Sequence, residues 1–233
     1  MQRYFAESLK DNKPILSNDD IHHLLNVVRI KNDEVFEIVL AEYLYKCTLV
    51  SRQPFNFNII EKSIIDDKGY RATLYIASTK SDKIELVLQK CTEIGIDNFI
   101  IFNSQRSVIK FTCESFDKKK DRYQKILKEA SEQSKKDCIP TISFVETPSA
   151  NSYDSKFIAY ENASLDSINE FSKLKESKNI AFIVGPEGGF SSEEVSKYNA
   201  QGFVSISLGR NILRCETAPI YIASLISFIK GGR

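Results

Sequence analysis

The chain has no tryptophan, one methionine and two histidines, which stand next to each other at His22 and His23. Because a zinc site needs three or four spaced ligands, and no two cysteines form a C-x-x-C pair, we expect no bound metal. The five cysteines are odd in number and scattered, which is typical of free thiols in a reducing compartment. We therefore expect a cytoplasmic protein without disulfides.

Long apolar runs and a large net charge are also missing. The most apolar stretch, Ala218–Ile229, contains two serines and is shorter than the ~20 residues that span a bilayer. The start, Met1–Glu7, lacks the basic-then-apolar order of a signal peptide, so we expect no membrane partner. Lysine and arginine total 32 against 31 acids, a net charge of +1. Any nucleic-acid surface must therefore be a local basic patch.

Hydrophobic periodicity divides the chain in two. Apolar positions over Ser17–Arg29 have the spacing of an amphipathic helix, with Ser17 or Asp19 as its cap. Short β-rich runs around it predict a small β-barrel in residues 1–70: Val35–Leu40, Tyr45–Val50 and Asn56–Ile60.

Residues 71–233 alternate between strand and helix patterns, which predicts an α/β domain with a mostly parallel sheet covered on both faces. An Asp82/Glu85 capping box and Gly95 should begin and end the first helix of this domain. The predicted strands are Thr73–Ala77, Phe99–Phe102, Thr141–Val145, Phe157–Tyr160, Ile180–Val184 and Val204–Leu208. The predicted helices are Lys83–Ile94, Asp117–Ser134, Leu165–Leu174, Glu193–Ala200 and Thr217–Ile229.

A glycine-rich loop, Gly185–Phe190, follows the buried strand Ile180–Val184. Ser191 and Glu194 form a capping box, so this loop presents backbone amides at a helix N-terminus. Glycines let a ligand approach the backbone closely. The loop matches neither a Walker A nor a G-x-G-x-x-G motif, and a turn without a ligand remains an alternative.

A second loop, Gly209–Pro219, places Arg214 and Glu216 between a buried strand and an apolar final helix. Charges beside so much apolar sequence cost desolvation free energy unless they pair or contact a ligand. A structural salt bridge that caps the last helix is the alternative. Because both loops follow successive strands, we expect them to meet around one pocket.

The segment Phe116–Lys136 carries eight lysines and arginines against four acids. Tyr123, Ile126, Leu127 and Ala130 give it an apolar stripe, which leaves the cations pointing outward. This pattern suits contact with a phosphate backbone, and it equally suits a solvated helix face.

These two loops, GPEGGFS at Gly185–Ser191 and LGRNILRCETA at Leu208–Ala218, resemble the signature loops of the ribosomal RNA small-subunit methyltransferase E family, in the SPOUT superfamily. Weaker matches occur in the expected order along the chain: Arg3–Phe5, His23–Arg29, Lys90–Gly95, Arg106–Val108 and Glu132–Ser134. After these, the family usually has glycine and arginines, where Lys135–Pro140 stand here. Lysine cannot offer the planar fork of arginine.

The resemblance implies a trefoil-knotted methyltransferase domain (71–233) after a PUA-like barrel (1–70) that binds RNA. It implies a homodimer that uses S-adenosylmethionine to methylate N3 of one uridine (position 1498 in the usual numbering) in 16S rRNA of the small ribosomal subunit. Arg214 would stabilise charge on the uracil, and Glu216 would orient Arg214 or act as base. The implied cofactor-binding residues are Gly185, Pro186, Glu187, Gly188, Gly189, Leu208, Gly209, Asn211, Ile212 and Leu213. The implied RNA-binding residues are Arg3, His23, Arg29, Arg106, Lys135 and Lys136, together with the Lys118–Lys136 face.

Two other functions remain open at this point. The chain could be an RNA-binding or ribosome-assembly protein that keeps the fold without methyl transfer. It could also be a small-molecule enzyme that uses the glycine-rich loop for a nucleotide.

Overall fold

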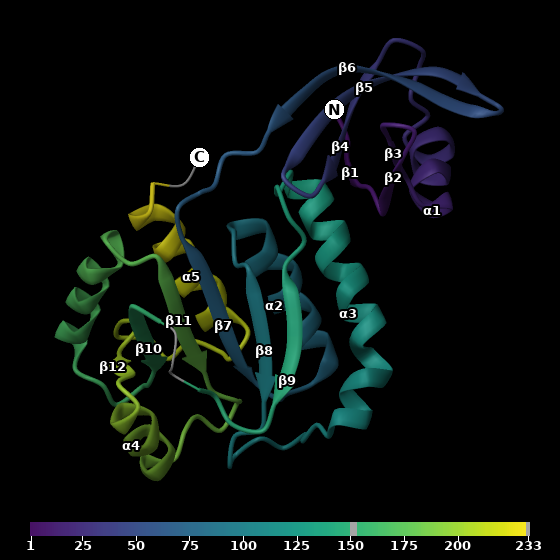
Figure 1. Cartoon of the computed structure of the whole chain (residues 1–233). Helices are drawn as coiled ribbons and strands as arrows, with labels where there is room; N and C mark the ends of the chain where they lie inside the picture. The colour runs from purple at the N-terminus through teal and green to yellow at the C-terminus, as the bar shows by residue number, and fades with distance from the viewer. Residues whose placement is uncertain (150–152, 232–233) are drawn as a thin grey trace. The chain divides into compact units, whose positions relative to one another are not determined.

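The computed structural model describes residues 1–149 and 153–231 (Figure 1). The chain separates into two compact units. Unit 1 comprises Met1–Asp67 and Ser131–Ile139, and unit 2 comprises Lys68–Ala130 and Pro140–Arg233. Helix α3 (Cys113–Ser134) is continuous through Ala130 and Ser131, so the boundary between unit 2 and unit 1 falls inside this helix.

Unit 1 is a small β domain. Its main sheet has the order β1-β4-β5-β6, and β2 and β3 form a separate antiparallel pair. Along β5 the side chains of Tyr45, Cys47 and Leu49 are buried in alternation, as expected for a strand with one face in a core. The strands are β1 (Arg3–Phe5), β2 (Ser8–Lys10), β3 (Lys13–Ile15), β4 (Val35–Leu40), β5 (Tyr43–Arg52) and β6 (Phe55–Ile64).

The helix expected over Ser17–Arg29 exists, but only half of it is α-helical. Ser17 is the N-cap, and its side chain accepts a hydrogen bond from the Asp20 amide. The α-helix α1 (Asn18–His22) then passes into the π-helix η1 (His23–Val27). The Arg52 guanidinium donates to the carbonyls of Leu25 and Ile30, which supplies partners at the end of this wider turn.

Unit 2 contains a six-stranded sheet in the order β12-β10-β11-β7-β8-β9, in which every pairing is parallel. This confirms the predicted α/β class. The strands are β7 (Arg71–Ala77), β8 (Asn98–Phe102), β9 (Thr141–Val145), β10 (Ser155–Ala159), β11 (Asn179–Val184) and β12 (Val204–Ile206). The helices are α2 (Ser81–Ile94), α3 (Cys113–Ser134), the 3-10 helix η2 (Leu165–Lys175), α4 (Ser192–Ala200) and α5 (Thr217–Ile229).

Helices cover both faces of this sheet. Alternate residues of the central strands, such as Tyr75 and Ile183, pack in one cluster with Val195 and Tyr198 of α4. Helices α2 and α5 contact each other on the opposite face (Figure 1). Strands buried on both faces read as continuous apolar runs, which is the pattern of Ile180–Val184 in β11.

The structure corrects one local prediction in unit 2 and specifies the type of one predicted helix. The predicted Asp82/Glu85 capping box is wrong, because α2 begins after Lys80, whose side chain makes no capping hydrogen bond. Glu85 instead accepts a hydrogen bond of 2.7 Å from Arg122 of α3. The helix predicted over Leu165–Leu174 is present as a 3-10 helix, Leu165–Lys175. Gly95 does end α2, with a left-handed φ of 115°.

Candidate active site

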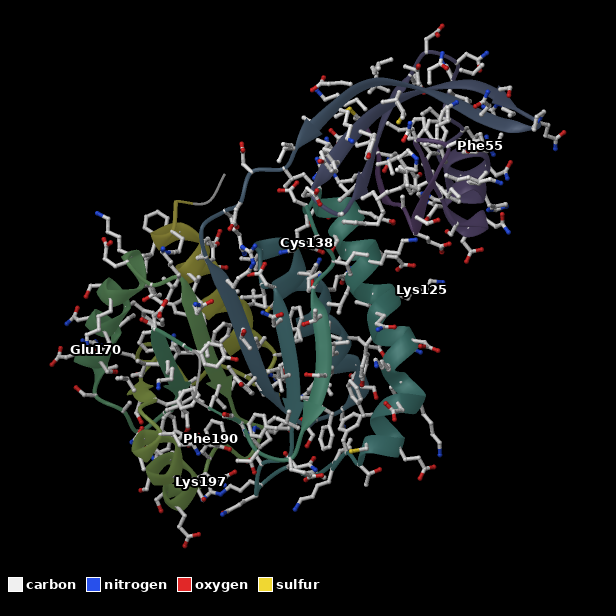
Figure 2. The ribbon with its side chains drawn as sticks, in the orientation of Figure 1. Phe55, Lys125, Cys138, Glu170, Phe190 and Lys197 are labelled. Carbon is white, nitrogen blue, oxygen red and sulfur yellow. The ribbon has the colours of Figure 1, made fainter. Side chains whose placement is uncertain are left out.

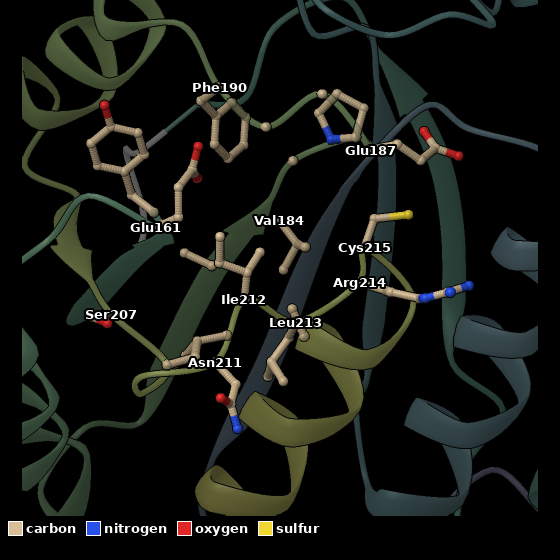
Figure 3. Close-up of a pocket in the computed structure, with 18 of the residues that line it drawn as sticks. Glu161, Val184, Glu187, Phe190, Ser207, Asn211, Ile212, Leu213, Arg214 and Cys215 are labelled. Atoms are coloured by element: carbon tan, nitrogen blue, oxygen red, sulfur yellow. The ribbon is translucent and has the colours of Figure 1, made fainter.

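The two loops singled out in the sequence meet around one cavity of about 590 Å³ (Figure 3). They leave the carboxyl ends of β11 and β12, and β10 lies between these strands in the sheet. Ligands of open α/β sheets bind at this edge. All ten predicted cofactor-binding residues line the cavity, and Arg214 lines it as well. Cys215 also lines the cavity, and Glu216 follows it in the sequence without being a lining residue.

The glycine-rich loop contains an internal turn that is closed by a backbone hydrogen bond. Gly189 has a left-handed φ of 64°, and its amide donates to the Pro186 carbonyl at 2.9 Å. A Cβ at Gly189 would lie 2.8 Å from Oε1 of Glu161, and a Cβ at Gly188 would lie 3.3 Å from the Cβ of Arg106. A side chain at either position would therefore displace a neighbour, which explains why glycine stands there.

The predicted capping box at the start of α4 is confirmed. The Ser191 hydroxyl accepts from the Glu194 amide, and the Glu194 carboxylate accepts from the Ser191 amide. Glu194 is buried and also accepts from the Ser104 hydroxyl and the Gln105 amide. The glycine-rich loop is thus anchored both to α4 and to the segment that follows β8.

The middle of the cavity is apolar. Figure 3 shows the side chains of Val184, Ile212 and Leu213 there, with Glu161 and Phe190 toward one end and Glu187 and Cys215 toward the other. Ile212 is 83% exposed although it is a large hydrophobic residue. Burying such a side chain against a flat apolar ligand would be favourable by about 1.5–3 kcal/mol.

At one end of the cavity Lys83 lies among acidic and thiol groups. Its ammonium is 3.0 Å from a carboxylate oxygen of Glu187, which also accepts from the Thr79 hydroxyl at 2.5 Å. Hydrogen bonding to Glu187 raises the pKa of Lys83. Burial by itself would raise the pKa of Glu187, but the hydrogen bonds from Thr79 and Lys83 lower it overall. Both groups are therefore charged at neutral pH.

Glu216 lies beside the same ammonium, at 3.4 Å, and accepts a hydrogen bond from the Cys215 thiol at 3.2 Å. Burial opposes its ionisation, yet these partners lower the pKa of Glu216 overall. Burial is the main reason that the pKa of Cys215 rises to about 11. Arg214 has a freely accessible side chain, 83% exposed, with its guanidinium 4.0 Å from Glu216. Arg214 and Arg210 are therefore exposed cations at the cavity, and a carboxylate that is a weak base lies 4.0 Å from Arg214.

Arg3 differs from the other predicted RNA contacts because it is buried, with 5% of the residue exposed. Its guanidinium bonds Glu37 at 2.9 Å, Asp137 at 2.8 Å and the carbonyl of Lys135 at 2.6 Å, all in unit 1. These partners occupy the guanidinium, so we assign Arg3 to holding the segment 131–139 rather than to phosphate contact. This departs from the prediction.

His23 and Arg29 are exposed in unit 1. The His23 ring hydrogen-bonds the buried Tyr4 hydroxyl at 2.9 Å, and burial raises the pKa of that hydroxyl. Arg29 has a positive φ of 56° and follows Val28, the C-cap of the π-helix. The side chain of Lys135 is exposed, and Lys136 is half-buried.

In unit 2, Arg106 is exposed and donates to the Gly188 carbonyl at 3.0 Å, which connects it to the glycine-rich loop. Most cations of α3 are exposed, as Lys125 is in Figure 2, while Lys119 and Lys128 are half-buried and Tyr123 and Leu127 are fully buried. Several of these cations pair with acids of the helix itself or of α2. This confirms the predicted inward stripe of the helix and leaves phosphate contact as a prediction.

Sequence reasoning missed several residues of the site, among them Thr79, Lys83 and Glu161. A signal for two of these three existed, because Thr79 and Glu161 stand two positions after the ends of β7 and β10, at the edge where ligands bind. Lys83 had no such signal, since a lysine in the first turn of a helix is commonplace. Among residues 1–149 and 153–231, no cluster of three or more metal-ligating side chains exists, and no helix has the length and hydropathy to cross a bilayer.

Comparison with known proteins gives a consistent result over the whole chain. Residues 66–227 match the RNA methyltransferase domain family, and residues 16–59 match the RNA methyltransferase PUA domain family. Ribosomal RNA small subunit methyltransferase E of Bacillus subtilis is 35% identical, over 98% of this chain and 96% of its own. A protein of Borreliella burgdorferi, ribosomal RNA small subunit methyltransferase E 2, is 32% identical over 86% and 84%. The crystal structure of a ribosomal RNA small subunit methyltransferase E from Neisseria gonorrhoeae, bound to S-adenosyl methionine, is similar with a TM-score of 0.80 and 25% identity. The match covers 98% of this chain and 97% of that one.

Proposed function

The chain belongs to the ribosomal RNA small subunit methyltransferase E family, and on that premise we propose that it transfers a methyl group from S-adenosylmethionine to N3 of a uridine in 16S ribosomal RNA. The observation that carries this proposal is the meeting of two loops, 185–190 and 208–215, around a single cavity. That cavity combines an apolar middle with exposed cations at its rim.

The residues present fit S-adenosylmethionine. When bound, this cofactor would supply a methyl group attached to a sulfonium, from which the sulfur leaves readily as a neutral thioether. Backbone groups of Gly185–Gly189 and of 208–213 would hold it, since the close approach that glycine permits suits a ligand bonded mainly by the main chain. Ile212 and Leu213 would cover the adenine, a flat apolar surface that needs few polar contacts.

Arg214 is the residue to which we assign charge stabilisation. Uridine N3 carries a proton at neutral pH, and losing that proton places negative charge on the neighbouring carbonyl oxygens. A guanidinium held beside those oxygens stabilises this charge in the transition state. The accessible side chain of Arg214 at the cavity suits that task.

Glu216 orients Arg214 in this proposal. The alternative role, general base, needs a group that accepts a proton near neutral pH. The pKa of Glu216 is lowered by hydrogen bonds from Cys215 and Lys83 in spite of partial burial, so its carboxylate is a weak proton acceptor. Orientation is therefore the role that its surroundings favour.

We propose His23 and Arg29 of unit 1, Arg106 of unit 2, the exposed lysines of α3, Lys135 and the half-buried Lys136 as contacts to the RNA. The exposure of all of these side chains except Lys136 supports this assignment. Where cations neutralise phosphates, affinity falls as salt rises. Unit 1 adds a second line of support, because part of it matches the RNA methyltransferase PUA domain family.

We also propose that the protein is a cytoplasmic homodimer with a trefoil-knotted unit 2. Helix α5 supports the dimer, because one face is in the core through Ile222 and Ile226 while Phe228 is 83% exposed and Tyr221 is 38% exposed. A location in the cytoplasm follows from the proposed ribosomal substrate.

The test is transfer of labelled methyl from S-adenosylmethionine to small subunits that lack the modification, with wild type and Arg214→Ala. Wild type should label the RNA, and the variant should lose turnover by at least about 100-fold while cofactor affinity stays within about threefold. Cofactor binding without transfer would identify an RNA-binding protein instead. Normal turnover by the variant would remove Arg214 from the mechanism.

A further inference from the structure

Lys83 contacts both loops of the cavity from a third element. Its ammonium lies 3.0 Å from Oε1 of Glu187 in the glycine-rich loop and 3.4 Å from Oε2 of Glu216 in the second loop. It also lies 3.7 Å from the thiol of Cys215. The side chain is 23% exposed, which reduces the solvent screening of these contacts.

Lys83 stands on a helix that is packed into the core of unit 2. The neighbouring residues of α2, Ile84, Val87 and Leu88, are 0–1% exposed in the core of unit 2. Thr79, which is 5% exposed, bonds the same oxygen of Glu187 from the end of β7. Glu187 is thus held between the sheet and α2, whereas Glu216 has its contact to α2 through Lys83.

Like charges explain why a cation is needed at this place. The side chains of Glu187 and Glu216 are 36% and 15% exposed, and both carboxylates form an ion pair with the Lys83 ammonium. Without that ammonium, two carboxylates would face each other next to the cavity and repel. The two loops that carry them would then lose their common contact.

We propose that Lys83 is a positioning residue for methyl transfer. It holds together the glycine-rich loop, here called the cofactor loop, and the second loop, here called the Arg214 loop. The inference rests on the proposed function for its chemistry. Lys83 acts on the cofactor loop through Glu187, and on Arg214 through Glu216, whose other oxygen lies 4.0 Å from that guanidinium. Because these contacts use two different carboxylates, the effect of Lys83 on the cofactor loop and its effect on Arg214 can be measured separately.

Variants of Lys83 test the proposal in the full-length protein without cofactor. Lys83→Met should speed backbone hydrogen exchange in both 185–190 and 211–216, measured by mass spectrometry, while the rest of unit 2 keeps its protection. Lys83→Arg should restore slow exchange, because arginine keeps a cation that reaches both carboxylates. Lys173→Met is the matched control, since Lys173 pairs with Glu170 on η2, away from the cavity. It should leave both loops unchanged.

Kinetic and binding measurements then separate the two arms. Glu187→Gln should weaken S-adenosylmethionine binding in calorimetry by about tenfold with a smaller loss in kcat, and Glu216→Gln should lower kcat by about tenfold with little change in affinity. Lys83→Met should show both losses, and Lys83→Arg should recover within about threefold of wild type.

The inference is overturned if Lys83→Met leaves exchange in both loops and cofactor affinity unchanged. It is equally overturned if exchange rises throughout unit 2, because that result means a general structural role. If wild type binds no S-adenosylmethionine, the proposed function fails. The exchange data still decide whether Lys83 joins the two loops.

Discussion

The guanidinium of Arg3 lies 2.8 Å from the carboxylate of Asp137, although 134 positions separate the two residues in the sequence. The same guanidinium bonds the carbonyls of Lys135 and Lys136 and the carboxylate of Glu37. Strand β1 and the segment that follows α3 therefore belong to one unit. A residue expected to face RNA instead holds two distant parts of the chain together.

Arg3→Ala should destabilise unit 1 strongly. The Arg3–Glu37 pair has side-chain exposures of 6% and 5%, so the substitution leaves the Glu37 carboxylate buried without its cation. Breaking such a pair from one side costs about 3–5 kcal/mol. Urea unfolding followed by circular dichroism should show the loss of unfolding free energy.

The control is Lys118→Ala, which removes the cation of an exposed pair on α3. Lys118 and Glu114 are 72% and 80% exposed, and such surface pairs contribute about 0–1 kcal/mol. Equal losses for both variants would contradict the structural role given to Arg3.

Gly189→Ala should weaken S-adenosylmethionine binding. Alanine at a left-handed φ of 64° costs roughly 1–2 kcal/mol, and its Cβ would lie 2.8 Å from Oε1 of Glu161. Either the loop or Glu161 must move at the cavity, so the dissociation constant measured by calorimetry should rise at least about tenfold.

Gly69→Ala provides the control for this substitution. Gly69 has a similar φ of 75°, but no atom lies within 4 Å of the added Cβ. It should cost stability for the same backbone reason and leave cofactor affinity unchanged. If both variants weaken binding alike, the contact with Glu161 is irrelevant to the cofactor.

The contribution of Glu187 to stability should depend on pH. Its pKa in the folded protein is below the ordinary value of 4.5, because hydrogen bonds from Thr79 and Lys83 outweigh the opposing effect of burial. Stabilisation from a lowered carboxyl pKa is present above the unfolded pKa and is lost as pH falls through the folded pKa. Wild type should therefore exceed Glu187→Gln in unfolding free energy at pH 7, and the difference should shrink below pH 4.5. A difference that grows on acidification would contradict the assignment.

Much of the fold follows from local sequence alone. The strands Val35–Leu40 and Thr141–Val145 and the helix Thr217–Ile229 have the predicted bounds, because their apolar periodicity or continuous apolar runs leave one favourable conformation. The capping box of Ser191 and Glu194 is equally local, since both partners are three residues apart. Such features need no information from the rest of the chain.

Other features depend on partners that are distant in sequence. Glu85 has the right spacing for a cap, but Arg122 of another helix binds its carboxylate. The sequence of Leu165–Lys175 has a helical pattern, and the segment forms a 3-10 helix. Its Ser167 hydroxyl accepts a hydrogen bond from the amide of Ser207, the residue that follows β12. Local spacing alone cannot decide between such competing partners.

The candidate site divides in the same way. The residue types of both loops and their place after buried strands were enough to predict one pocket, because parallel strands end at a common edge. The burial of Arg3 and the reach of Lys83 to two carboxylates were decided by tertiary structure. The free energy of a charged side chain depends on which groups the fold brings within a few ångströms of it, and no local pattern contains those distances.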